Sequence, residues 1–200
     1  MALRDGTYRF GPPTSRLLIK TSRAGPGRRA GHDLTIEATR WSGTAVVVAR
    51  DPGKSSVTVS VETGSLAVRE GTGGVKPLTD TDKAEIKRTL EREGVLHTAQ
   101  HPTIAFRSTS ITGTLGSFQI TGDLTIKGRS HPVTVDGGSD GDGMVCGRAT
   151  VAQSAWGIKP YSAFLGALRV ADDVRIEYAV TELEPLPGPG PGPGQGSEQP

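Results

Sequence analysis

Hydrophobic and polar residues alternate most clearly between positions 117 and 127. Side chains on a β-strand point to opposite faces at a period of two, so this stretch predicts a long strand with one apolar and one polar face. The apolar row consists of Phe118, Ile120, Leu124 and Ile126. Gly122 lies in the same row and leaves room for a bend or a close neighbour. After a turn at residues 128–132 the alternation resumes at Val133 and Val135, which predicts a hairpin.

The same alternation recurs along most of the chain. Further strands are predicted in these ranges: 8–10, 16–21, 34–38, 44–49, 57–61, 65–69, 103–107, 144–151 and 170–184. Pro12 and Pro13 interrupt the first two ranges, because proline cannot continue a strand ladder. Turn residues such as those at 51–54 separate most of the others.

One helix is predicted after residue 79. Thr79 is a suitable N-cap and Asp82, three residues later, forms an imperfect capping box, since glutamate or glutamine is preferred there. Ile86 and Leu90 are four residues apart and form a narrow apolar stripe, and Gly94 is the expected C-cap. A helix with so narrow a stripe lies on the surface and cannot cover all the strands.

The sequence thus predicts about eight to ten amphipathic strands and a single helix. Because the helix is too small to cover all the strands, the apolar faces of the strands must cover one another. We therefore predict an all-β protein, either a β-sandwich or an antiparallel closed β-barrel of about eight strands, with one amphipathic surface helix; closure removes exposed sheet edges. A barrel of that size can hold one small ligand. The sequence pattern leaves open whether the interior is a packed core or an apolar pocket.

Composition narrows the class of protein. A net charge of +2 argues against a dedicated nucleic-acid-binding protein, and a single cysteine, Cys146, allows no internal disulfide. The start of the chain lacks the apolar stretch of a secretory signal, and no run is long enough to span a membrane. We expect a cytoplasmic protein with one domain over residues 1–184, and a disordered Pro/Gly-rich tail over residues 185–200.

Five stretches resemble the YceI-like family of lipocalin-like bacterial barrels. They are residues 30–38 (AGHDLTIEA), 74–80 (GVKPLTD), 99–108 (AQHPTIAFRS), 120–128 (ITGDLTIKG) and 153–162 (QSAWGIKPYS). Their order and spacing carry the resemblance, which covers roughly residues 7–183. The resemblance implies a polyisoprenoid-binding type of barrel that holds a long amphiphile, such as an isoprenoid or an isoprenoid quinone. Many members carry a signal peptide, and this sequence does not begin with one.

Candidate ligand-binding residues are mainly the apolar side chains expected to point inward, together with aromatic residues that could rim a mouth. They are Leu34, Ile36, Trp41, Phe106, Phe118, Ile120, Leu124, Ile126, Trp156, Tyr161, Phe164, Ile176 and Tyr178. Candidates for contact with a polar head group are His32, Gln153 and Lys159. The alternative for the apolar set is ordinary core packing, and for the polar set surface salt links and turn hydrogen bonds.

Other chemistry is weakly indicated. His97 and His101 are four residues apart, but Gly94 and Pro102 disfavour a helix there, so we predict no metal site. The basic loop with Arg23, Arg28 and Arg29 is interpreted as solvated rather than as a surface for anionic lipid or nucleic acid. No cofactor motif is present in the sequence.

The leading hypothesis is a non-enzymatic carrier for a hydrophobic or amphiphilic small molecule, such as an isoprenoid, an isoprenoid quinone or a fatty-acid-like chain. One alternative is an enzyme that uses His32 and Lys159 as acid and base in the barrel. Another is a stress-response interaction protein with a filled core. The sequence leaves the oligomeric state open, and a homodimer is compatible with it.

Overall fold

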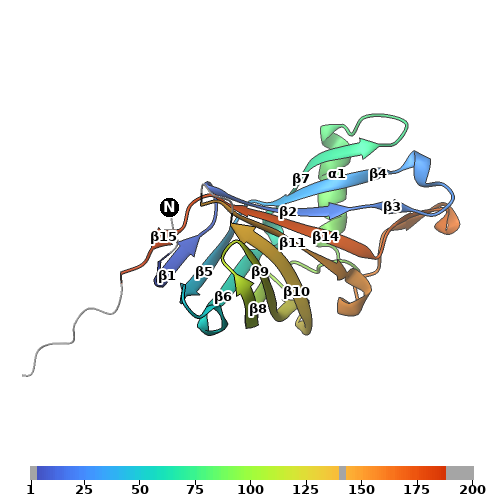
Figure 1. Ribbon diagram of the computed structural model, residues 1–200. Helices are drawn as coiled ribbons and strands as arrows, with labels where there is room; N and C mark the ends of the chain where they lie inside the picture. The colour runs from blue at the N-terminus through green and yellow to red at the C-terminus, as the bar shows by residue number, and fades with distance from the viewer. Residues whose placement is uncertain (1–3, 140–142, 188–200) are drawn as a thin grey trace, which may run out of the picture.

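The computed structural model describes residues 4–139 and 143–187 of the 200-residue chain (Figure 1). Its strands are β1 Gly6–Phe10, β2 Ser15–Thr21, β3 Arg23–Ala24, β4 His32–Ala38, β5 Trp41–Val47, β6 Ser56–Glu62, β7 Leu66–Gly73, β8 Thr103–Thr114, β9 Ser117–Ile126, β10 Arg129–Ser139, β11 Val145–Ala152, β12 Ser162–Ala163, β13 Leu168–Val170, β14 Asp173–Val180 and β15 Glu184–Pro185. The α-helix is α1 Asp80–Glu91, and the 3-10 turns are η1 Arg28–Ala30, η2 Pro52–Lys54, η3 Thr63–Ser65, η4 Gln153–Trp156 and η5 Phe164–Gly166. The protein is mostly β, as the alternation predicts.

Twelve of the strands form one curled antiparallel sheet in the order β15-β1-β5-β6-β8-β9-β10-β11-β14-β2-β4-β7. β15 and β7 stand at the two ends of this order. β15 pairs with β1 and β7 pairs with β4, and the two end strands do not pair with each other in the described ranges. The predicted closed barrel of about eight strands is therefore corrected to a curled sheet that forms a half-barrel of twelve strands. β3, β12 and β13 form a separate small sheet.

Three interruptions in the chain, each of which the predicted strand ranges already contain, separate consecutive strands of the main sheet. Residues 11–14 separate β1 from β2, residues 39–40 separate β4 from β5, and η3 separates β6 from β7. At the last two corners hydroxyl groups hold the bent backbone: Thr39 Oγ1 donates to the Ser65 carbonyl at 2.8 Å and Ser65 Oγ to the Arg40 carbonyl at 3.1 Å. These short polar side chains replace ladder hydrogen bonds that the bends remove.

The central hairpin of β9 and β10 is confirmed, with a shorter turn than expected. Ile126 pairs with Arg129, so Lys127 and Gly128 alone connect the strands, with φ of 52° and 71°. Two consecutive residues in the left-handed region are typical of a type I′ turn, whose second position favours glycine. His131 consequently lies within β10 rather than in the turn.

The predicted helix is confirmed as α1, and its capping box is complete. The Thr79 hydroxyl accepts from the Asp82 amide, while the Asp82 carboxylate accepts from the Thr79 amide at 2.8 Å. Aspartate therefore serves where glutamate was expected. The predicted C-cap was wrong: Arg92 caps the helix in an extended conformation, and Gly94 lies beyond it. α1 packs against β7 and buries none of its residues fully.

The core lies on the concave face of the curled sheet. Its buried members include Ile36, Trp41, Ile126, Trp156 and Val174. Residues 188–200, which include most of the predicted disordered tail, lie outside the described residues, while Pro185 takes part in β15. No helix in the described ranges is both long and apolar enough to cross a membrane.

Candidate ligand-binding cavity

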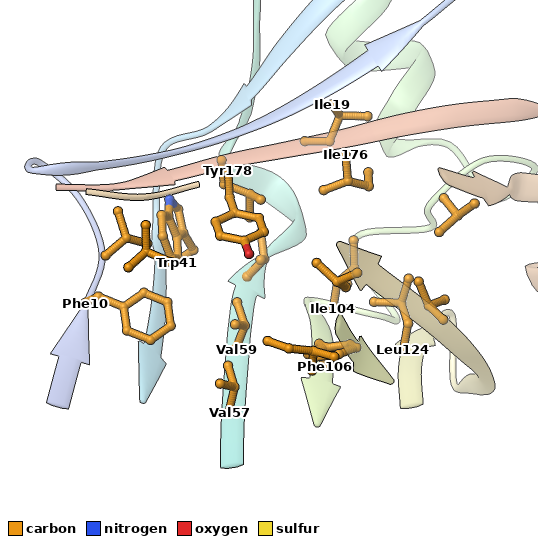
Figure 2. Close-up of a pocket in the computed structure, with 18 of the residues that line it drawn as sticks. Phe10, Ile19, Trp41, Val57, Val59, Ile104, Phe106, Leu124, Ile176 and Tyr178 are labelled. Carbon is orange, nitrogen blue, oxygen red and sulfur yellow. The ribbon is translucent and has the colours of Figure 1, made fainter. Parts of the chain in front are cut away.

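An apolar cavity of about 700 Å³ lies inside the curl of the main sheet (Figure 2). Nearly every strand of that sheet contributes inward-pointing side chains, because the period-two alternation places one face of each strand inside. Leu90 from α1, with Val95 and Leu96 from the turn after it, also lines the cavity, and so do Pro52 and Leu115 from turns between strands. The residues that line it in the described part of the chain include no Asp, Glu, Lys, Arg or His.

Most of the predicted ligand-binding residues line this cavity. These are Ile36, Trp41, Phe106, Phe118, Ile120, Leu124, Ile126, Trp156, Ile176 and Tyr178. The lining also includes residues that we did not predict, and Figure 2 shows several of them: Phe10, Ile19, Val57, Val59 and Ile104. Alternation could have identified Val57, Val59 and Ile104, whereas the nearby prolines obscured the pattern around Phe10.

Two predicted apolar residues, Leu34 and Tyr161, do not line the cavity. Leu34 packs against the core without lining the cavity, and Tyr161 is 54% exposed near the small sheet. The backbone of Phe164 belongs to η5, and its side chain lies outside the described residues. Tyr161 therefore does not contribute to the aromatic rim that we expected, and for Phe164 the rim stays a prediction.

The three head-group candidates do not converge. Gln153 lines the cavity and its Nε2 donates to the Ala171 carbonyl at 2.9 Å. The His32 ring instead lies 2.7 Å from the Lys76 carbonyl, and Lys159 is exposed; neither lines the cavity. The hypothesis of a reaction chamber thus loses the acid and base on which it relied.

Aromatic rings in the lining lie against glycines of neighbouring strands. Phe10 pairs with Gly43, Phe118 with Gly137 and Tyr178 with Gly147. A Cβ added at Gly43 would overlap the Phe10 ring, and one added at Gly147 would lie 2.5 Å from the Tyr178 hydroxyl. A Cβ at Gly122 would likewise lie 2.5 Å from the Phe106 ring, which confirms the close neighbour expected there. The missing side chains let these rings lie along the wall of the cavity.

Two polar groups of the lining residues are buried without a partner. Tyr178 OH and Trp41 Nε1 make no hydrogen bond within the described residues. Burial raises the pKa of Tyr178, and the negative charges that Cys146 and Asp136 can carry add to the effect. Trp156, in contrast, donates from Nε1 to the Leu124 carbonyl at 3.1 Å. The Tyr178 hydroxyl therefore stays protonated at neutral pH and contributes no charge to the cavity.

The wall of the cavity is incompletely paired between β10 and β11. Their ladder covers only Asp136–Ser139 on β10, and a groove of about 640 Å³ follows the unpaired parts of the two strands. Val133, Val151 and Trp156 line both this groove and the cavity. Side chains rather than paired backbone therefore separate the two spaces at this position.

The described residues do not assemble a metal centre. The rings of His97 and His101 lie 5.8 Å apart, edge to face. Within residues 4–139 and 143–187, no third His, Cys, Asp or Glu joins them to make a metal-binding group.

Comparisons with known proteins agree on one family. The family model described as a YceI-like domain matches residues 16–181. The Protein YceI of Escherichia coli O157:H7 is 31% identical over 103 residues, or 52% of this chain and 47% of that protein. A UPF0312 protein of Ectopseudomonas mendocina is 32% identical over 96 residues, or 48% of this chain and 44% of that protein. The aligned part of the chain thus spans about half the length of these curated relatives.

Solved structures show the same fold. BcnA of Burkholderia cenocepacia superposes with a TM-score of 0.63 and 17% identity, over 83% of this chain and 94% of that one. The YCEI protein of Campylobacter jejuni superposes with a TM-score of 0.57 and 14% identity, over 76% and 85%. At such identities the likeness concerns the fold alone.

Proposed function

Since this chain belongs to the family of YceI-like domains, we propose that it is a binding protein that carries a hydrophobic or amphiphilic small molecule in its cavity. The observation that supports the proposal most directly is the apolar cavity of about 700 Å³ without a charged side chain in its described lining. Ligand pockets of proteins typically measure about 300–1,000 Å³ and have mainly apolar walls.

The occupant is an apolar chain of the isoprenoid, isoprenoid-quinone or fatty-acid class. Burying each methylene contributes about 0.8 kcal/mol, so a chain of about ten methylenes contributes roughly 8 kcal/mol before the cost of association is subtracted. An ionised head group would find no counter-charge in the described lining, and Gln153 is the one head-group candidate that lines the cavity. We therefore place a charged head, where the ligand has one, outside the apolar part of the cavity.

This proposal is favoured over the two alternatives. A protein with a filled core would not leave a cavity of this size, and an enzyme using His32 and Lys159 would need both side chains in the cavity. The cytoplasmic location and the homodimer stay predictions from the sequence.

The test combines native mass spectrometry of the gently extracted protein with titration of a fluorescent fatty-acid probe. Val59 lines the cavity, and Val59→Trp should fill part of it and weaken probe binding by about tenfold or more, which corresponds to ~1.4 kcal/mol. Ser60→Trp is the matched control, because Ser60 is exposed on the opposite face of β6. An empty extracted protein that also takes up no probe would refute the proposal, and so would equal probe binding by wild type and Val59→Trp.

A further inference from the structure

Exposed hydrophobic side chains gather at one end of the molecule. In the described chain the large exposed hydrophobic residues are Val46, Val75, Tyr161 and Leu165, with exposures of 40%, 81%, 54% and 110%. Tyr161 and Leu165 lie beside β12 of the small sheet, whose strand β3 is labelled to the right in Figure 1, and Val75 follows the end of β7. Scattered exposed hydrophobic residues need no explanation, but a local concentration marks an interaction surface.

Hydrogen bonds tie these segments into one structure, which we call the basic tip and define as residues 23–32, 73–76 and 161–170. The Gly27 amide donates to the Ala167 carbonyl at 2.8 Å, and Arg169 pairs with Ala24. The third segment is joined through the His32 ring, 2.7 Å from the Lys76 carbonyl. The apolar side chains are therefore held on the same tip of the fold.

Unpaired basic side chains share this tip. Arg28, Arg29, Lys76 and Arg169 are all exposed, and none of them has a side-chain hydrogen bond or ion pair within the described residues. The three segments of the tip contain no acidic residue. Asp33, directly after the first segment, is engaged by Arg23: its carboxylate accepts from the Arg23 amide at 2.7 Å and lies 3.6 Å from Arg23 Nε. The tip thus has an uncompensated positive charge although the whole chain carries only +2.

Leu165 is the most exposed of the apolar residues. It lies in η5 with φ 54° and ψ 34°, the left-handed region that a leucine rarely adopts. Its side chain is fully exposed in the described fold, so no packing contact there offsets the cost of this backbone conformation. A partner that covers Leu165 would supply the missing burial.

We propose that the basic tip docks on an anionic lipid surface, with Leu165, Val75 and Tyr161 entering the interfacial region. Apolar side chains interspersed with arginine and lysine are typical of membrane-surface binding, since the cations meet the lipid phosphates while the apolar groups leave water. The core of a protein–protein interface is depleted in charge, unlike this tip. Single-stranded nucleic acid is recognised by aromatic stacking, to which Val75 and Leu165 could not contribute. The docking does not depend on an occupied cavity.

The test is flotation of the full chain with phosphatidylcholine vesicles that contain or lack phosphatidylglycerol. We expect binding only to the anionic vesicles, weakened by salt because charge attraction is screened. Each basic side chain near such a surface contributes about fivefold in affinity, so Arg28→Glu with Arg29→Glu should lower binding by at least about 25-fold. Leu165→Ser should also weaken binding and leave its dependence on salt unchanged.

The matched control is Arg107→Glu with Arg148→Glu. Both arginines are exposed and unpaired in the described structure but lie on β8 and β11 of the main sheet. Thermal melting verifies that every variant is folded. Absence of binding to anionic vesicles would overturn the proposal, as would an equal loss in the control or tighter binding to a DNA duplex than to vesicles. Val59→Trp should bind vesicles like the wild type, so failure of the docking and failure of the proposed carrier function are separate results.

Discussion

Tyr178→Phe should stabilise the protein, because the Tyr178 hydroxyl is buried without a hydrogen-bond partner in the described structure. Such a hydroxyl has lost its bonds to water, at a cost of about 1–3 kcal/mol. Removing the oxygen leaves a small void beside Gly137 and Gly147, which returns part of that gain. We expect the free energy of unfolding to rise by about 1–2 kcal/mol, or about 2–4 °C in Tm for each kcal/mol.

The same hydroxyl predicts a dependence on pH. Burial raises the pKa of Tyr178 above the value of about 10 that tyrosine has in an unfolded chain. Below about pH 10 the residue is neutral in both states and its contribution to stability is constant. Above that pH the unfolded chain loses the proton while the folded protein keeps it, so stability falls by about 1.4 kcal/mol per pH unit. Phenylalanine has no such proton, and the advantage of Tyr178→Phe should therefore grow as the pH rises above 10.

Urea denaturation at about pH 7 and about pH 11 measures both effects. Trp41 and Trp156 are buried in the folded protein, so their fluorescence reports unfolding. Tyr161→Phe is the control, because Tyr161 is 54% exposed and its hydroxyl should contribute little. A Tyr178→Phe variant that is less stable than wild type at pH 7, or whose advantage is the same at both pH values, would refute this reasoning.

Two further predictions concern the two faces of the sheet. Glu37 lies between Arg69 and Arg16 on the outside; burial opposes its charged form, but hydrogen bonds from both arginines lower its pKa overall. Glu37→Gln should therefore lower the free energy of unfolding by about 1 kcal/mol at neutral pH. This difference in stability between wild type and variant should vanish as the pH falls below about 4, where Glu37 becomes protonated. Acid unfolding titrations measure it, and an unchanged difference at low pH would contradict the prediction. On the inside, a Cβ at Gly43 would overlap the Phe10 ring, so Gly43→Ala should displace the ring into the cavity and weaken probe binding. The overpacking should also lower the free energy of unfolding by about 1–3 kcal/mol, and unchanged probe affinity would contradict this prediction.

Local patterns were sufficient to predict much of the fold. The alternation around Gly122 located the β9–β10 hairpin, and the spacing of Thr79 and Asp82 located α1, because both signals depend on residues close in sequence. The number of strands in the sheet and its predicted closure were wrong because both depend on which strands pair, including the end strands β15 and β7, which are far apart in sequence. The hydrogen bonds between the corners at residues 39–40 and 63–65 also join distant segments, which no local pattern contains.

The candidate site was predictable in its apolar wall and not in its polar contacts. Inward-facing residues such as Ile120 and Ile176 follow from period two alone. The orientation of His32 depends on where residue 76 returns to β4, and the exposure of Tyr161 depends on the separate small sheet. Both are consequences of tertiary packing between distant segments, so composition and spacing could not assign them to the cavity or to the surface.

The openness of the interior follows from register rather than from the scarcity of aromatic residues. Phe10, Phe118 and Tyr178 each lie opposite a glycine on the neighbouring strand, and Phe106 lies against Gly122. A ring that lies flat on a glycine covers the wall and projects little into the lumen, whereas the same ring opposite a larger residue would have to point inward. Cross-strand pairing of aromatic residues with glycine thus accounts for an interior that is mainly apolar and still has room for a ligand. The proposed carrier function depends on that arrangement more than on any single polar residue.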